Sequence, residues 1–114
     1  DMHTDGAFYS ITNKINEDEW DRWLKVWIPL YFEPDFNSLS LAKNSDKIKF
    51  NFDAKNFKDK LRPVFSQNND VSVLDWQLPV RKFGEVAVFS PNTLHRAINL
   101  NASFTRLSFE FAIC

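Results

Sequence analysis

The chain has 114 residues, of which 44% are hydrophobic and 16% aromatic, enough for one modest core, so a single domain is expected over residues 1–114. Lys and Arg number 14 against 15 Asp and Glu, and this formal net charge of −1 favours neither nucleic acid nor an anionic membrane surface as a partner. Apolar runs are far shorter than the roughly 20 residues that span a bilayer. The one cysteine, Cys114, excludes an internal disulfide and agrees with a reducing, cytoplasmic compartment.

Taken in chain order, the hydrophobic pattern predicts two short helices and several strands. The helices are expected over residues 17–23 and 54–61, the second with Asp53 as its cap. The expected strands show period-2 alternation or are rich in β-branched and aromatic residues. They cover residues 24–31, 47–52, 71–74, 86–89 and 104–111.

Turn-forming residues separate these segments, at residues 33–35, 44–46, 67–70, 83–85 and 90–92. Many short strands with regular turns predict a mainly β fold. The expected fold is a double-stranded β-helix, that is, a jelly roll or cupin-like barrel, with one or two short helices. The mouth of such a barrel can hold a ligand.

The chain has only two histidines, His3 and His95, and Asp5 lies two positions after the first. Residues two apart on an extended segment point to the same side, so His3 and Asp5 can reach one ion while Thr4 faces away. His95 follows the strand expected over residues 86–89, and only a folded sheet can bring it to the other two. Two imidazoles and one carboxylate hold ferrous iron on one face and leave positions open for a substrate and dioxygen. A redox metal site is therefore the leading hypothesis.

The last expected strand carries a second candidate group. Alternation places Arg106, Ser108 and Glu110 on one face of it. A fixed guanidinium beside a hydroxyl suits bidentate binding of a carboxylate, so Arg106 is a candidate anchor for a dicarboxylic cosubstrate beside iron.

Nearly the whole chain resembles the iron(II)/2-oxoglutarate-dependent dioxygenases, within them the phytanoyl-CoA hydroxylase-like group that includes antibiotic-tailoring hydroxylases. The motifs that carry this resemblance follow the family's order. They are HTDGAF at 3–8, VWIPL at 26–30, GEVAVF at 84–89, LHRA at 94–97, NAS at 101–103 and RLS at 106–108.

The resemblance implies specific roles for the candidate residues. His3, Asp5 and His95 would bind Fe(II), Arg106 would pair with the distal carboxylate of 2-oxoglutarate, and Ser108 would assist it. The implied reaction hydroxylates a small organic substrate with dioxygen and releases succinate and CO2. Related halogenases replace the carboxylate ligand by a small residue, so Asp5 favours a hydroxylase.

The chain departs from the family pattern in two places. Where members often carry a Pro-Gly-Ser-His-like turn, residues 41–46 keep only Ser45. Members also have a long stretch before the H-x-D motif, so an amino-terminally truncated member, the carboxy-terminal part of the barrel, is expected. The odd-numbered face of the last strand is too apolar to be left in water, and either a missing amino-terminal segment or a homo-oligomer is expected to cover it.

Two other classes of function stay open. A non-catalytic jelly-roll module that binds a ligand would keep the fold without turnover. A cupin-like enzyme with another metal, such as an isomerase, is the third reading, although cupins usually supply more histidines. By default His3 would be a solvated residue near a terminus and Arg106 a surface salt-bridge partner.

Overall fold

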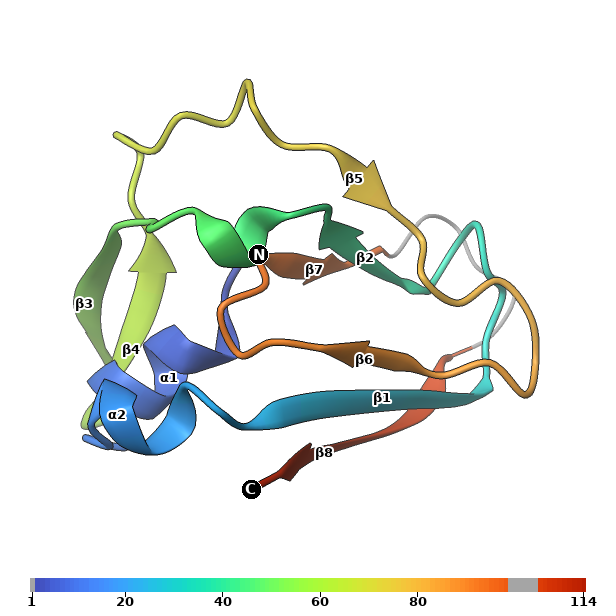
Figure 1. The fold of residues 1–114 in the computed structure, drawn as a ribbon, viewed down its shortest axis with the longest axis horizontal. Helices are drawn as coiled ribbons and strands as arrows, with labels where there is room; N and C mark the ends of the chain where they lie inside the picture. The colour runs from blue at the N-terminus through green and yellow to red at the C-terminus, as the bar shows by residue number, and fades with distance from the viewer. Residues whose placement is uncertain (1, 99–104) are drawn as a thin grey trace.

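The computed structural model describes residues 2–98 and 105–114, and Figure 1 shows their arrangement. Within these residues the chain is mainly β, with eight strands in three antiparallel sheets and only short helices. Asn101, Ala102, Ser103 and Phe104, which the sequence analysis used, lie outside the described residues. None of the helices described is long and apolar enough to cross a membrane.

The first sheet has the order β6-β1-β8, with β1 at Leu24–Tyr31, β6 at Ala87–Phe89 and β8 at Leu107–Ile113. The strand predicted over 24–31 is confirmed, and those predicted over 86–89 and 104–111 are found with shifted ends. Trp27 pairs with Ala87 on one side and with Glu110 on the other, so these three residues share the inner face.

The second sheet has the order β5-β2-β7, formed by Trp76–Gln77, Leu39–Ala42 and His95–Ala97. Figure 1 shows it above the first sheet, and the buried core joins residues of both sheets with those of the loops between them. This core consists of Trp27, Phe32, Leu39, Val80, Ala87 and Phe89.

Helices and a hairpin lie at one end of the two sheets (Figure 1). Helix α1 covers Asp5–Ile11, α2 covers Glu17–Trp20, and the 3₁₀ helix η1 covers Ser45–Lys47. Strands β3 (Phe52–Phe57) and β4 (Lys60–Phe65) form the hairpin. The hydroxyl of Thr12, at the end of α1, donates a 2.7 Å hydrogen bond to the carbonyl of Leu61, which ties the helix to β4.

The helix predicted over residues 54–61 is wrong, because this segment forms the β3-β4 hairpin. Its two-residue turn places Lys58 and Asp59 at φ 48° and 65°, the left-handed conformation that such a turn requires. Phe57 and Leu61, four apart as on a helix, lie instead on the two strands of the hairpin.

Two predicted strands are also wrong, and the first helix is shorter than expected. Residues 47–52 leave the 3₁₀ helix η1 and run as irregular chain until β3 begins at Phe52. Residues 71–74 form a turn, in which the Leu74 N–H donates to the Val71 carbonyl at 3.2 Å. Helix α2 ends at Trp20, where residues up to 23 had been expected.

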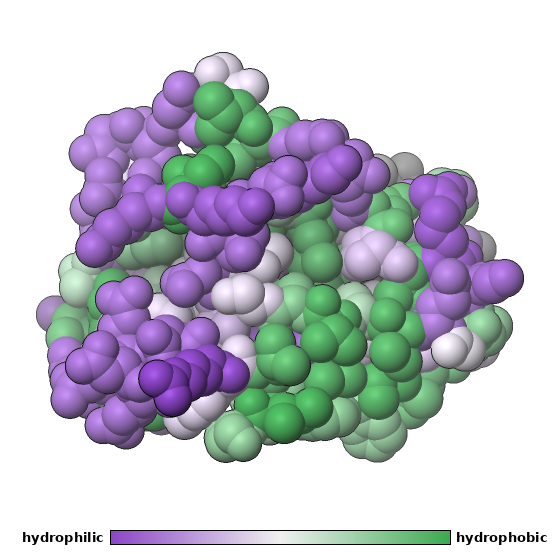
Figure 2. Space-filling model, viewed as in Figure 1, coloured by the Kyte–Doolittle hydropathy of each residue, from purple (hydrophilic) through white to green (hydrophobic). Residues whose placement is uncertain are grey.

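The outer face of the β6-β1-β8 sheet is apolar and exposed. Its side chains are between 44% and 63% exposed, and they are Leu24, Val88, Leu107, Phe109, Phe111 and Ile113. Figure 2 shows apolar residues gathered over the part of the molecule where this sheet lies. Nothing in the described part of the chain covers this face.

Candidate metal centre

A backbone bridge joins the amino-terminal segment to β7. The His3 N–H donates to the His95 carbonyl at 3.0 Å, and the His95 N–H donates to the His3 carbonyl at 2.9 Å. This reciprocal pair fixes the backbone at His3 relative to β7. The two imidazoles are thereby placed side by side, with ring centroids 4.2 Å apart.

Asp5 is positioned by the start of α1, where it is the first helical residue. The Thr4 side chain caps the helix by accepting from the Ala7 N–H at 3.2 Å, so it points away from the histidines. The Gly6 N–H donates to the Pro91 carbonyl at 2.8 Å. Gly6 has no room for a side chain, since a Cβ there would lie 2.6 Å from Cζ3 of Trp20.

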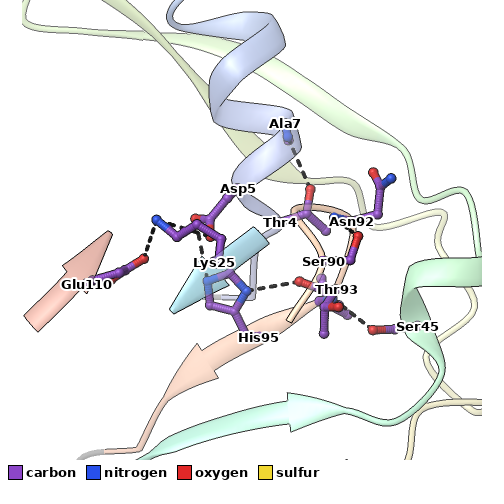
Figure 3. Close-up of polar contacts among 11 residues, drawn as sticks. Thr4, Asp5, Ala7, Lys25, Ser45, Ser90, Asn92, Thr93, His95 and Glu110 are labelled. Carbon is purple, nitrogen blue, oxygen red and sulfur yellow. Dashed lines mark hydrogen bonds and ion pairs between the residues drawn. The ribbon is translucent and has the colours of Figure 1, made fainter. Parts of the chain in front are cut away.

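The structure brings together the three residues predicted as metal ligands. One ligand atom from each of His3, Asp5 and His95 lies within 4.8 Å of the other two. Asp5 Oδ1 is 3.7 Å from His95 Nε2, and both side chains are buried (Figure 3). The cluster can therefore hold a metal ion.

A hydrogen bond determines which ring nitrogen of His95 is free to bind a metal ion. Its Nδ1 lies 3.0 Å from the Thr93 carbonyl oxygen, which can only accept, so Nδ1 carries the proton. The lone pair is left on Nε2, the atom that faces Asp5 (Figure 3). Such a second hydrogen bond orients most metal-binding histidines in proteins.

Burial lowers the pKa of His95, and it also lowers the pKa of His3. The negative charge of Asp5 opposes this shift at both residues without reversing it. Both imidazoles are therefore neutral at neutral pH, which is the form that binds a metal ion.

The Asp5 carboxylate provides a direct test of whether an ion fits. Its Oδ2 is buried and accepts no hydrogen bond from the described residues. The nearest cation, Lys25 Nζ, is 3.6 Å away. This ion pair leaves Oδ2 without a hydrogen bond, which costs free energy in a buried group, and a bound cation would lower that cost. The donor set and this oxygen thus fit a divalent ion.

Lys25 and Glu110 form a second layer that the sequence analysis did not assign to the site. Lys25 Nζ donates to Glu110 Oε1 at 3.0 Å, which links β1 and β8 beside Asp5 (Figure 3). Burial opposes the charge on Lys25, but the hydrogen bond to Glu110 and the negative charge of Asp5 outweigh it and raise its pKa. The available signal was the alternation of β1, which puts Lys25 on the same face as the buried Trp27.

A buried serine supports the segment before His95. Ser45 Oγ donates to the Ala42 carbonyl at 2.7 Å and accepts from the Leu94 N–H at 2.8 Å. This relay fixes the position of β7 relative to η1 and β2.

Arg106 and Ser108 do not belong to the cluster of ligands. Ser108 precedes Glu110 on the inner face of β8, and Arg106 lies just before this strand begins at Leu107. The Arg106 guanidinium lies over the Trp27 ring, 5.4 Å from its centroid, and Nη1 donates a long 3.5 Å bond to the Asn37 carbonyl. Burial lowers the pKa of Arg106, and the negative charge of Glu110 opposes this shift.

Comparison of the chain with protein-family models, with curated proteins and with solved structures finds no match.

Proposed function

We propose that this chain is an iron(II)- and 2-oxoglutarate-dependent oxygenase that hydroxylates a small organic substrate. The observation that carries the proposal is the cluster of His3, Asp5 and His95, in which a buried carboxylate oxygen of Asp5 accepts no hydrogen bond from the described residues. A core between two antiparallel sheets, with the cluster at one end, agrees with the double-stranded β-helix that we propose as the fold.

In this proposal His3, Asp5 and His95 hold Fe(II) on one face. Two neutral imidazoles and one carboxylate are the donor set that suits non-haem ferrous iron. Iron bound there would supply the redox chemistry that couples decarboxylation of 2-oxoglutarate by dioxygen to substrate hydroxylation, with succinate and CO2 as products. The carboxylate of Asp5 favours a hydroxylase over a halogenase.

The other residues of the site position the reactants. Arg106 anchors the distal carboxylate of 2-oxoglutarate through a charge-assisted pair, and Ser108, two positions further along the chain, assists it. Lys25 orients the Asp5 carboxylate and is itself held by Glu110. The Thr93 carbonyl keeps the His95 ring in the orientation and tautomer that metal binding requires.

An anaerobic titration tests the proposal. Ferrous iron and then 2-oxoglutarate are added to the purified chain while the weak visible charge-transfer band of the chelated keto acid is recorded. We expect the band in the wild type and its loss in His95→Ala. A folded protein that gives no band would contradict the proposal and would favour a jelly-roll module that binds a ligand without turnover.

A further inference from the structure

A cleft of about 1090 Å³ opens beside the metal cluster, between the start of α1 and the β3-β4 hairpin. His3 and Phe8 form one part of its wall, and Phe57 and Phe65 of the hairpin form another. Its volume is that of a site for a small organic molecule. Because His3 lines the cleft, a molecule bound there lies next to the candidate metal centre.

The charged residues of this cleft are all cations. Lys55, Arg62 and Arg96 line it, and no Asp or Glu is among its lining residues. In the described part of the chain, none of the three forms an ion pair with a carboxylate. Asp53, which shares a hairpin face with Lys55, does not line the cleft. The cleft therefore has an uncompensated positive charge.

Two of these cations lie directly opposite each other in the hairpin register. Lys55 of β3 pairs with Arg62 of β4. Like charges at directly opposed positions of an antiparallel pair destabilise it, whereas opposite charges stabilise it. An anion bound between the two side chains would remove the repulsion.

Aromatic rings orient the two guanidinium groups. Arg62 lies over the rings of Phe57 and Phe8, at 5.3 Å and 5.8 Å from their centroids. Arg96 lies over the Trp76 ring at 3.9 Å. A guanidinium group stacked by its face keeps the N–H donors at its edge for a carboxylate or phosphate.

From these observations we infer that the cleft binds the substrate, and that the substrate is a small organic anion with an aromatic or apolar body. Its carboxylate or phosphate group binds Lys55, Arg62 and Arg96, and its body packs on Phe8 and Phe57. The identification of this ligand as a substrate rests on the proposed oxygenase function. The anion site itself rests on the cleft alone.

Binding of 3-phenylpropionate to the metal-free protein, measured by calorimetry, tests the anion site. We expect saturable binding of the acid. The neutral 3-phenylpropanamide should bind more weakly by roughly tenfold or more, the loss typical of a hydrogen bond to a charged group.

Arg62→Gln and Lys55→Gln should weaken binding of the acid to a similar extent. Lys60→Gln removes a charge from the same hairpin outside the cleft and should leave the affinity unchanged. Equal loss in Lys60→Gln, or no difference between acid and amide, would overturn the proposal.

Lys55→Glu separates anion binding from stability. It replaces the opposed cations by an opposite-charge pair, so the thermal midpoint of the free protein should rise while binding of 3-phenylpropionate is lost. Unchanged binding in this variant would overturn the proposal.

Competition distinguishes a substrate site from a site for the cosubstrate. We expect 2-oxoglutarate not to displace 3-phenylpropionate, and Arg62→Gln to leave the iron-dependent charge-transfer band intact. Displacement, or loss of the band in Arg62→Gln, would assign the cleft to 2-oxoglutarate and overturn the substrate proposal. A missing band in the wild type with intact probe binding would reject the oxygenase function while supporting the anion site.

Discussion

Among the residues that the structure describes, Asp5 is the one carboxylate whose ligand atom lies in the His3 and His95 cluster, and its Oδ2 is buried without a hydrogen bond. We expect Asp5→Ala to abolish stoichiometric iron binding, because two neutral imidazoles alone leave the ion without a charged ligand. Iron content after anaerobic loading and desalting measures this. Asp18→Ala, which removes an exposed carboxylate from α2, is the control and should keep wild-type iron. Full iron content in Asp5→Ala would contradict the ligand assignment.

Arg106 is expected to contribute to cosubstrate binding rather than to metal binding. Arg106→Ala should weaken 2-oxoglutarate binding by about 1.5 to 3 kcal/mol, the range for a hydrogen bond to a charged group. The charge-transfer band at increasing 2-oxoglutarate reports this affinity. Arg81→Ala removes an exposed arginine that pairs with Asp35 at 3.2 Å and should have no effect. An unchanged cosubstrate affinity in Arg106→Ala would place the anchor elsewhere.

The two histidines of the cluster predict how the stability of the metal-free protein depends on pH. Burial lowers the pKa of both His3 and His95 in the folded state, so the unfolded chain binds more protons as the pH falls. The free energy of unfolding should thus fall as the pH is lowered below the ordinary histidine pKa of about 6.5. Urea unfolding with a chelator present measures this, and the double variant His3→Gln/His95→Gln should lose this part of the dependence. The same slope in the double variant would show that other groups cause it.

At the scale of elements, the packing of α1 against Trp20 links stability to the site. Gly6→Ala would drive a methyl group into the Trp20 ring, and such overpacking typically costs about 1 to 3 kcal/mol. Asp5 precedes Gly6, so iron affinity should fall together with the free energy of unfolding. Urea unfolding and iron titration measure the two effects.

The double variant Gly6→Ala/Trp20→Leu provides the control for this prediction. It restores space beside α1 and should recover part of the lost iron affinity. An iron affinity that stays low when the space is restored would show that the Trp20 contact is not the cause.

The ligand cluster could be predicted from the sequence, whereas several elements around it could not. His3 and Asp5 are close in sequence. Because His95 is the only other histidine of the chain, it was the natural third ligand. The hairpin was missed because Lys58 and Asp59 occupy left-handed turn positions where Asn or Gly usually gives the signal. Lys25 was not assigned to the site, because its ion pairs depend on how β1 and β8 align.

Local hydrogen bonds explain why two segments were wrongly predicted as strands. Residues 47–52 alternate as a strand does, but the preceding turn at Asn44 and the hydrogen bonds of Ser45 commit the chain to η1. In the segment 71–74, Val71 and Val73 favour a strand, yet Asp70 accepts from the N–H and the hydroxyl of Ser72 and forms a turn. In both segments, hydrogen bonds between side chains and nearby residues decided the local structure, and the hydrophobic pattern did not.

At the scale of the whole molecule, the outer face of the β6-β1-β8 sheet predicts association. We expect the chain to self-associate through this face in dilute buffer, which sedimentation velocity measures. Phe109 is 63% exposed, and Phe109→Asp should weaken association by at least about tenfold, as loss of one buried aromatic side chain implies. Val73→Asp alters an exposed residue away from this sheet and should not weaken it. A monomeric wild type would mean that this face needs another partner.

The bridge between His3 and His95 gives a bound ion a role that does not depend on turnover. These residues are 92 positions apart, so one ion bound to both closes a loop of almost the entire chain. Closing a loop of that length lowers the conformational entropy of the unfolded chain by an amount worth about 4.6 kcal/mol at 25 °C. An ion bound at this cluster would therefore act as a reversible cross-link, and the protease resistance of the protein should rise when iron is supplied. Starvation for iron would then lower the amount of the protein.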